Sequence, residues 1–241
     1  MQRTALVTGG TRGIGAAAAR ALSAAGHRVA VSYTGNREAA HAFNIETGIA
    51  VFRWDVADAE ACREGIAQVE AVHGPVDILV NNAGIAAASA FHRMQPDTWR
   101  RAIDVNLNSL FNMCRPVIEG MRARGFGRIV NMSSMNAQRG EFSNAHYAAA
   151  KAGVLGFTKA LALEGAGRNI TVNAISPGYV ETDMSRSIPP AILEETIRRQ
   201  IPAGRLAQVE EIARIVVFLT GEEAGFITGA TLNVSGGQLM A

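Results

Sequence analysis

Short apolar segments alternate with longer helix-like segments along the whole chain. The apolar segments predict seven β-strands at residues 4–7, 28–32, 50–54, 76–80, 128–132, 170–175 and 231–234. The segments between them predict helices at residues 14–25, 36–47, 58–73, 96–124, 145–164 and 209–219. Strands that are apolar throughout and separated by helices indicate a parallel sheet covered on both faces. We therefore predict an α/β fold: a single doubly wound Rossmann domain over residues 1–241 with a seven-stranded parallel sheet.

Composition narrows the class of protein. With 48% hydrophobic and 18% charged residues, the chain is not disordered. The 23 basic and 21 acidic residues give a net charge of +2 without charge runs, so a nucleic-acid-binding stripe is excluded. No apolar stretch approaches the roughly 20 residues that span a bilayer. No hydrophobic region precedes the first glycine-rich turn, so we also expect no secretory signal.

The cysteines indicate the cellular compartment, and the spacing of the histidines argues against a metal site. Cys62 and Cys114 lie in predicted helices and are too few for a disulfide framework. We expect both to be reduced core residues of a cytoplasmic protein. None of the five histidines pairs with another at metal-ligand spacing, so we predict no metal site.

A glycine-rich motif at residues 8–15, TGGTRGIG, lies between the first predicted strand and the first predicted helix. Glycines there allow a tight turn and close approach of the backbone to a pyrophosphate, which rests on the helix N-terminus. The spacing is a variant of the usual dinucleotide fingerprint. Glycine for shape alone is the alternative. The candidate cofactor-binding residues in the motif are Gly9, Thr11, Arg12, Gly13, Ile14 and Gly15.

The choice of nicotinamide cofactor follows from a missing acid. A fold that selects NAD normally carries Asp or Glu about 20 residues past the glycine turn. Here the second strand ends in Ser32-Tyr33-Thr34, and no acid appears until Glu38. Arg12 and Arg37 instead suit a ribose 2′-phosphate, so we predict NADP(H). The alternative is that these arginines are merely solvated.

A second motif carries acid–base chemistry. Tyr147 and Lys151 are four residues apart on a predicted helix, so both side chains face the same way. A phenol has a pKa near 10, and a neighbouring ammonium stabilises the phenolate and lowers that pKa towards the working range. Ser133 and Ser134 follow a predicted strand. A Tyr-x-x-x-Lys pattern alone is common by chance.

Taken together, these motifs resemble the short-chain dehydrogenase/reductase family in order and spacing. The gap from Ser134 to Tyr147 is 13 residues, as is usual in that family, which selects Ser134 over Ser133. The resemblance covers essentially the whole chain. Its motifs here are residues 8–15, Asn81-Asn82-Ala83-Gly84, Ser134, Tyr147-x-x-x-Lys151, Pro177-Gly178 and Ile227-Thr228-Gly229-Ala230.

The resemblance implies catalytic roles for four residues. Tyr147 would protonate the substrate carbonyl oxygen, and Ser134 would hydrogen-bond to that oxygen as it gains charge. Lys151 would hold the nicotinamide ribose and lower the pKa of Tyr147. Asn106 would anchor a water molecule in a proton relay.

The resemblance also implies further binding residues. Those expected to contact the cofactor are Asp55, Val56, Asn82, Ala83, Gly84, Tyr147, Lys151, Pro177, Gly178, Val180 and Thr182, besides the glycine turn and Arg37. Those expected to contact the substrate are Ser134, Gln138, Tyr147 and Tyr179. Structural alternatives remain for some: Asn81 and Gly84 in stabilising the sheet, Asp55 as a helix cap, and Thr182 as a cap beside a short lid at about residues 183–202.

Within the family, the chain is most similar to acetoacetyl-CoA reductases of polyhydroxyalkanoate synthesis, through the stretches at residues 106–112, 115–121 and 125–131. Two stretches depart from them: Ala86-Ala87-Ala88 replaces a polar run, and Glu141 adds an acid. The leading prediction is NADPH-dependent reduction of a 3-oxoacyl thioester, with acetoacetyl-CoA first. The alternatives are 3-oxoacyl-[acyl-carrier-protein] reduction, broad ketone reduction, and a non-catalytic cofactor-sensing protein.

The last prediction concerns assembly. The helices at 96–124 and 145–164 carry more apolar positions than one sheet face needs. Family members pair these two helices between subunits, which implies a homotetramer. The alternative is that both helices are simply deep core. The apolar positions are Val105, Leu107, Leu110, Phe111, Met113, Cys114, Val154, Leu155, Phe157, Leu161 and Leu163.

Overall fold

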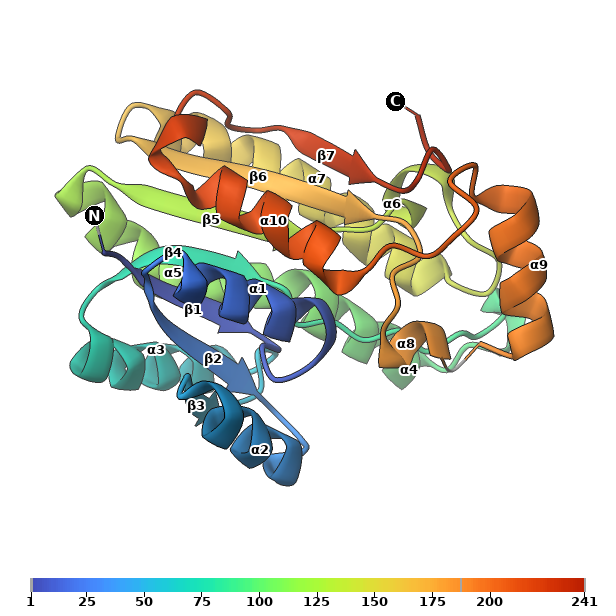
Figure 1. The fold of residues 1–241 in the computed structure, drawn as a ribbon, viewed down its shortest axis with the longest axis horizontal. Coiled ribbons are helices and arrows are strands. Elements are labelled where there is room, and N and C mark those ends of the chain that lie inside the picture. Colours follow the sequence, from blue (N-terminus) through green and yellow to red (C-terminus); the bar gives the residue numbers. More distant parts are fainter. Residues whose placement is uncertain (1, 187, 241) are drawn as a thin grey trace.

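Seven strands form one parallel sheet in the computed structural model, which describes residues 2–186 and 188–240 apart from the side chain at position 198. The order across the sheet is β3-β2-β1-β4-β5-β6-β7 (Figure 1), and every neighbouring pair is parallel. The predicted α/β fold with a seven-stranded parallel sheet of Rossmann type is confirmed. The strands are β1 (Thr4–Thr8), β2 (Arg28–Tyr33), β3 (Ala50–Arg53), β4 (Val76–Asn81), β5 (Gly127–Met132), β6 (Ile170–Pro177) and β7 (Thr231–Val234).

Helices connect the strands, and side-chain hydrogen bonds cap several of their N-termini. Asn36 accepts a hydrogen bond from the backbone of Ala39, and Asp58 accepts from Glu60 and Ala61, so both residues cap a helix from outside it. The helices are α1 (Gly13–Ala24), α2 (Arg37–Thr47), α3 (Ala59–His73), α4 (Pro96–Ile103), α5 (Ser109–Arg124), α6 (Asn136–Arg139), α7 (Ala145–Ala166), α8 (Asp183–Arg186), α9 (Pro190–Gln200) and α10 (Val209–Thr220). Shorter 3-10 turns lie at Phe91–Arg93 and Glu222–Ala224.

The single helix predicted at 96–124 is wrong in one respect. A π-helical stretch, Asp104–Asn108, separates α4 from α5. It carries Asn106, whose amide nitrogen donates both to the Ala102 carbonyl and to the Ile85 carbonyl, at 2.9 Å each. The chain stays helical through this stretch, so the spacing of apolar residues does not reveal it. Single π-helical turns of this kind occur frequently at functional sites.

Two apolar layers cover the two faces of the sheet. Residues of α1, α2 and α10 pack on one face, and residues of α3, α5 and α7 pack on the other. Because both faces are covered, strands β1, β4, β5 and β6 are buried along their whole length. Cys62 and Cys114 are free and buried in the second layer, as predicted, and burial raises the pKa of each thiol to about 12.

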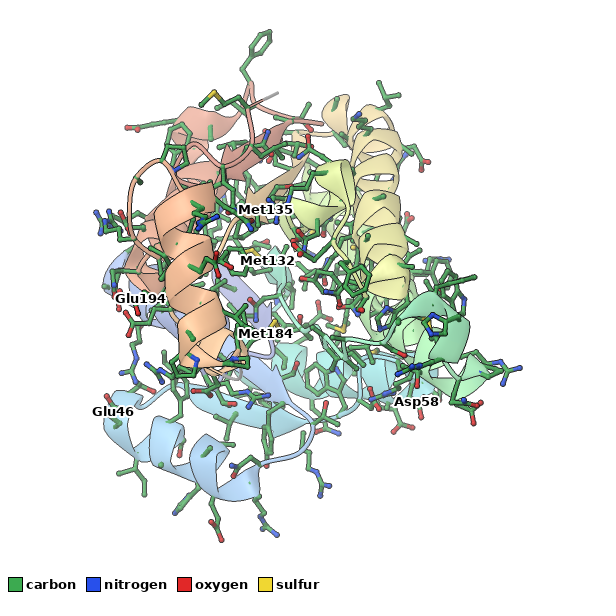
Figure 2. The ribbon with its side chains drawn as sticks, turned by 90° about the vertical axis from the view of Figure 1, so that its right-hand side faces the viewer. Glu46, Asp58, Met132, Met135, Met184 and Glu194 are labelled. Atoms are coloured by element: carbon green, nitrogen blue, oxygen red, sulfur yellow. The ribbon has the colours of Figure 1, made fainter. Side chains whose placement is uncertain are left out.

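The carboxyl ends of the strands all meet at one edge of the sheet, at the right of Figure 1. The strand order reverses between β2-β1 and β4-β5, which is the switch point where doubly wound folds bind ligands. Figure 2 looks onto this edge, with Met132 and Met135 near its centre and Met184 of α8 and Glu194 of α9 beside them. The predicted lid at 183–202 coincides with α8 and α9, although its position 187 lies outside the described residues, as do Met1 and Ala241.

Neither a membrane-spanning helix nor a cluster of metal ligands occurs among the described residues. None of their helices is both long and apolar enough to cross a bilayer. Nor do three or more histidine, cysteine, aspartate or glutamate side chains gather among them in a way that could hold a metal ion.

Candidate active site

The glycine turn after β1 has the backbone shape that its sequence suggests. Gly9 and Gly13 have φ angles of +63° and +53°, in the left-handed region that favours glycine. A Cβ atom at Gly15 would overlap the carbonyl oxygen of Gly9, and one at Gly9 would lie 3.1 Å from the Cα of Ala83. The motif therefore forms a cradle without side chains at the start of α1. Such a cradle fits the pyrophosphate of a dinucleotide.

Hydrogen bonds clamp this turn to the segment after β4. The Thr8 hydroxyl accepts from the backbone nitrogens of Asn82 and Ala83, both at 3.0 Å. The Asn82 amide donates to the carbonyls of Thr8 and Gly9, at 2.9 and 3.2 Å. The predicted cofactor residues Asn82 and Ala83 therefore stand at the switch point with the glycine turn. Thr8, which sequence reasoning did not single out, provides the connection.

Basic side chains flank the end of β2, where an NAD-selecting fold would carry an acid. Arg37 begins α2, and Arg12 precedes α1 with its guanidinium 3.9 Å from the carboxylate of Asp183 on α8. Arg53, at the end of β3, donates from Nε to the Thr34 carbonyl at 3.2 Å. Arg53 was missed because its strand pairs with β2 only in the folded sheet.

Asp55 and Val56, two of the residues expected to contact the cofactor, follow β3. Asp55 accepts from the Ala57 nitrogen at 3.0 Å and forms an ion pair with Arg101 of α4 at 2.8 Å. Asp58, and not Asp55, is the helix cap. Val56 is buried, and its carbonyl accepts from the side chain of Asn112 at 3.0 Å.

The predicted catalytic residues converge at the carboxyl end of β5. Ser134 follows this strand and is buried, while Tyr147 on the first turn of α7 is partly exposed. Burial raises the pKa of the Tyr147 phenol, and a hydrogen bond with the Ser134 side chain acts in the opposite direction. The serine choice also has a structural reason. The Ser133 hydroxyl is bonded to the Lys151 carbonyl at 2.9 Å, whereas Ser134 lies beside the phenol.

Lys151 reaches the same place one turn further along α7. Its ammonium lies 5.7 Å from the centre of the Tyr147 ring and donates to the Met132 carbonyl at 2.7 Å. The side chain is buried, and loss of hydration lowers its pKa to about 8. An adjacent ammonium was expected to lower the pKa of Tyr147. In the chain itself burial has the larger effect, since it raises that pKa and disfavours the charge on Lys151 as well.

Asn106 connects this group to the loop after β4. Its side chain accepts from the Ile85 nitrogen at 3.2 Å and donates to the Ile85 carbonyl at 2.9 Å. A Cβ at Gly84 would lie 2.9 Å from the Asn106 amide oxygen and 3.6 Å from the Lys151 ammonium. Because glycine has no side chain, the backbone at Gly84 can lie close to both Asn106 and Lys151. Three predicted site residues therefore lie together here.

His146 is the main residue that sequence reasoning missed. It is one of the five histidines to which the sequence assigns no site, and it is fully buried immediately before Tyr147. Its Nε2 lies 2.9 Å from the Ala87 carbonyl, which ties the far half of the loop after β4 to the helix that carries the phenol. Its Nδ1 is buried and has no hydrogen-bond partner among the described residues. Its position directly before the candidate acid Tyr147 is the sequence signal that could have pointed to it.

The two remaining predicted substrate residues, Gln138 and Tyr179, lie on α6 and after β6. Gln138 donates to the Asn233 side chain at 2.7 Å. Burial and the nearby Glu141 carboxylate raise the pKa of Tyr179, so these two residues are close. The acid at position 141 is compensated, because Arg139 forms an ion pair with it at 2.7 Å.

The segment after β6 closes the group on its other side. Met135 donates its backbone N–H to the Pro177 carbonyl at 3.0 Å, and Gly178 donates to Val234 at 2.8 Å. Val180 is buried, and Thr182 exchanges backbone and side-chain hydrogen bonds with Ser185. Thr182 is thus a local cap, as the structural alternative held, and it also approaches the glycine turn.

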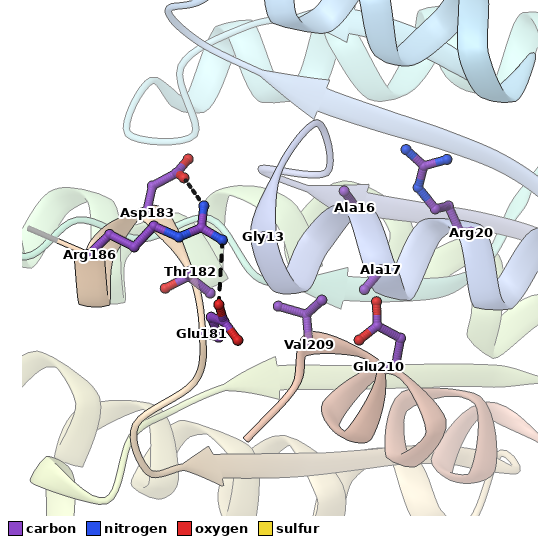
Figure 3. Close-up of a pocket in the computed structure, with 10 residues that line it drawn as sticks. All are labelled: Gly13, Ala16, Ala17, Arg20, Glu181, Thr182, Asp183, Arg186, Val209 and Glu210. Atoms are coloured by element: carbon purple, nitrogen blue, oxygen red, sulfur yellow. Dashed lines mark hydrogen bonds and ion pairs between the residues drawn. The ribbon is translucent and has the colours of Figure 1, made fainter. Parts of the chain in front are cut away.

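A cavity of about 230 Å³ lies where this segment meets α1 (Figure 3). Arg186 contacts Asp183 at 3.3 Å and Glu181 at 3.8 Å across one side of it. None of the predicted catalytic residues lines this cavity, but Gly13 and Thr182 do. The cavity therefore borders the glycine turn on a side away from the predicted catalytic residues.

Comparison with known proteins agrees with this geometry. A family profile described as enoyl-(acyl carrier protein) reductase matches residues 9–238. The chain belongs to the short-chain dehydrogenase/reductase family. This membership makes it an oxidoreductase and implies a nicotinamide cofactor.

Full-length relatives lie within this family. The chain is 62% identical over 238 residues to an acetoacetyl-CoA reductase of Shinella zoogloeoides, covering 99% of both chains. It is 58% identical over 241 residues to an acetoacetyl-CoA reductase of Rhizobium meliloti, covering 100% of both. It is also 41% identical over 240 residues to the 3-oxoacyl-[acyl-carrier-protein] reductase of Escherichia coli, covering 99% of this chain and 98% of that one.

Proposed function

We propose that the protein reduces a 3-oxoacyl thioester to the 3-hydroxyacyl thioester with NADPH, and that acetoacetyl-CoA is its first substrate. One observation carries this proposal: Ser134, Tyr147 and Lys151 converge at the carboxyl end of β5, opposite the glycine turn. The names of relatives at 57 to 62% identity, all acetoacetyl-CoA reductases, support the substrate class.

The residues divide the reaction among them. When bound, the reduced nicotinamide supplies the hydride that the substrate carbonyl carbon accepts. The Ser134 hydroxyl holds the carbonyl oxygen, and Tyr147 gives its phenolic proton to that oxygen as negative charge develops there. Lys151 lies beside the phenol and would hold the nicotinamide ribose of a bound cofactor, and Asn106 keeps the loop at Gly84 against it. The raised pKa of Tyr147 keeps the phenol protonated, as an acid must be before the reaction.

The cofactor choice rests on charge. Arg12 and Arg37 are available to a 2′-phosphate beside the end of β2. The hydroxyl of Thr34, also at the end of β2, donates a hydrogen bond to the Trp54 carbonyl. A bound phosphate would take the place of Asp183 on Arg12, because that ion pair is long and exposed.

A thioester on acyl carrier protein is the second candidate. The E. coli relative supports it, and so does the loss of polar side chains at Ala86-Ala87-Ala88, which leaves that part of the substrate mouth unspecific. A broad ketone reductase follows from the same loss. A non-catalytic cofactor sensor is disfavoured, because such a protein has no need of the assembled Ser134, Tyr147 and Lys151.

We further propose that residues 1–241 act as one catalytic domain in the cytoplasm, with a lid at about residues 183–202, and that four copies assemble. Phe111 on α5 and Leu163 on α7 are 60% and 84% exposed, and Leu155, Phe157 and Leu161 of α7 are only partly buried in the chain itself. Apolar side chains left outside the core on two helices support a subunit interface there.

A substrate screen tests the proposal. NADPH oxidation is followed with acetoacetyl-CoA, with a 3-oxoacyl thioester of acyl carrier protein, and with simple ketones at equal concentrations. We expect the highest kcat/KM with acetoacetyl-CoA. A higher value with the carrier-protein thioester or with a ketone would assign the alternative, and no oxidation with any of them would contradict the reductase itself.

A further inference from the structure

A second cavity, of about 370 Å³, lies at the opposite end of the sheet from the candidate active site. Its lining residues stand just before β1, at the start of β5, just before β6 and in the turn after α10. The volume lies at the lower end of the range of small-molecule sites, about 300–1,000 Å³. The residues that line it are Arg3, Phe126, Arg128, Asn169, Glu222 and Gly225.

Arg128 is buried in the wall of this cavity without an acidic partner. Only 2% of it is exposed, and its hydrogen bonds go to neutral carbonyls. Nη1 donates to Gly127 and Asn169 at 2.9 and 3.0 Å, and Nε donates to Gly221 at 3.4 Å. No ion pair of Arg128 occurs within the described residues. Buried charges in proteins are normally paired, because loss of hydration is costly.

Arg3 brings a second positive charge to the same cavity. Its guanidinium carbon lies 3.8 Å from the centre of the Phe126 ring, and that of Arg128 lies 4.4 Å from it. The Nε of Arg3 is buried and has no hydrogen-bond partner among the described residues. Its nearest carboxylate, Glu222, is 3.9 Å away and 71% exposed.

The charges around the cavity do not balance. Two guanidinium groups face one exposed carboxylate, which leaves one positive charge uncompensated. Burial and the repulsion from Arg3 both lower the pKa of Arg128, against the opposite effect of Glu222. An anion held between the two guanidinium groups would relieve this repulsion. Phosphate carries close to two negative charges at neutral pH and matches the donors of arginine.

We propose that this cavity binds a phosphate group, either free or on a small phosphorylated metabolite, between Arg3 and Arg128. Arg3, whose side chain is 22% exposed, contributes its guanidinium to the phosphate, and Arg128 contributes charge from the buried wall. Glu222 opposes binding, because its carboxylate stands at the cavity edge. The site is independent of the proposed reductase function, since it shares no residue with the candidate active site.

Calorimetric titration of the full chain with inorganic phosphate and with glycerol 3-phosphate, at constant ionic strength set with sodium chloride, tests the proposal. Arg3→Gln is expected to weaken phosphate binding by at least about tenfold, and Glu222→Gln to tighten it several-fold. Arg63→Gln and Glu60→Gln, from an exposed ion pair on α3, change the net charge equally and serve as controls. They are expected to leave phosphate affinity within about twofold.

Arg3→Gln and Glu222→Gln are expected to change the phosphate affinity in opposite directions. Phosphate bound at the cofactor turn would show the same affinity in both variants as in wild type. Arg3→Lys keeps the charge and loses the planar guanidinium, so its phosphate affinity should fall between those of wild type and Arg3→Gln, and it guards against a folding defect. Tighter binding of glycerol 3-phosphate than of inorganic phosphate would assign a phosphorylated metabolite, and equal binding would assign the free ion. No binding at millimolar concentration, or an unchanged affinity in Arg3→Gln, would overturn the proposal.

Discussion

Replacing Lys151 by methionine removes a charge that the fold buries. The pKa of this lysine falls from 10.5 to about 8 because its ammonium loses hydration. At pH 7 the lysine is charged in both folded and unfolded chains, and its lowered pKa reduces the free energy of unfolding by about 3 kcal/mol. This loss fades as the pH rises from 8 towards 10.5, because the folded protein then carries a neutral amine. Lys151→Met should therefore be more stable than wild type at pH 7, and the difference should shrink by about 2 kcal/mol at pH 9.5.

Urea unfolding of the cofactor-free protein at both pH values measures this difference. Contributions from titrating groups that do not contact Lys151 are common to both proteins and cancel. Lys159, exposed on the same helix, is the matched control, and Lys159→Met should stay within about 0.5 kcal/mol of wild type at both pH values. If the stability difference between Lys151→Met and wild type does not change with pH, the buried ammonium is not desolvated as described. A loss of activity with a gain of stability would mark Lys151 as retained for function.

Three further predictions concern the cofactor, the loop after β4 and the assembly. NADPH should be preferred over NADH by at least about tenfold in kcat/KM, and Arg12→Ala or Arg37→Ala should each reduce this preference mainly through the KM for NADPH; equal kcat/KM values for the two cofactors would contradict the phosphate-binding role. His146→Ala should raise the thioester KM severalfold while cofactor affinity stays unchanged, because the hydrogen bond between His146 and the Ala87 carbonyl is lost. His146→Asn keeps a donor and should bring the KM most of the way back to the wild-type value. Unchanged kinetics in the alanine variant would leave His146 with a packing role only. Light scattering at micromolar concentration should give the mass of four chains, and a mass near 25.4 kDa would contradict the tetramer.

The strands and most helices followed from the sequence because the sheet is buried on both faces. The run at 76–80 is buried at every position, and apart from Asp77 it consists of apolar residues. The glycine turn and the Tyr147–Lys151 pair were equally accessible, since their geometry is local: a β-to-α turn and one turn of helix. Neither needs knowledge of distant contacts.

What the sequence did not reveal depends on contacts between distant segments. The π-helical stretch is held by Asn106 bonding to Ile85, 21 residues earlier, and the role of His146 depends on Ala87, 59 residues earlier. The direction of the Tyr147 pKa shift depends on how deeply the phenol and its lysine are buried. Helix spacing places the two groups together, but only the folded chain determines whether burial or charge dominates.

The central claim is that Tyr147 delivers the proton in a ketone reduction. The most direct test is the kcat of Tyr147→Phe with NADPH and acetoacetyl-CoA, measured beside its affinity for NADPH. We predict that kcat falls by about 10²–10⁴-fold, the usual effect of removing a general acid, while NADPH affinity stays close to wild type because the ring remains. Retention of near wild-type kcat by the phenylalanine variant would contradict the assignment of Tyr147 as the acid.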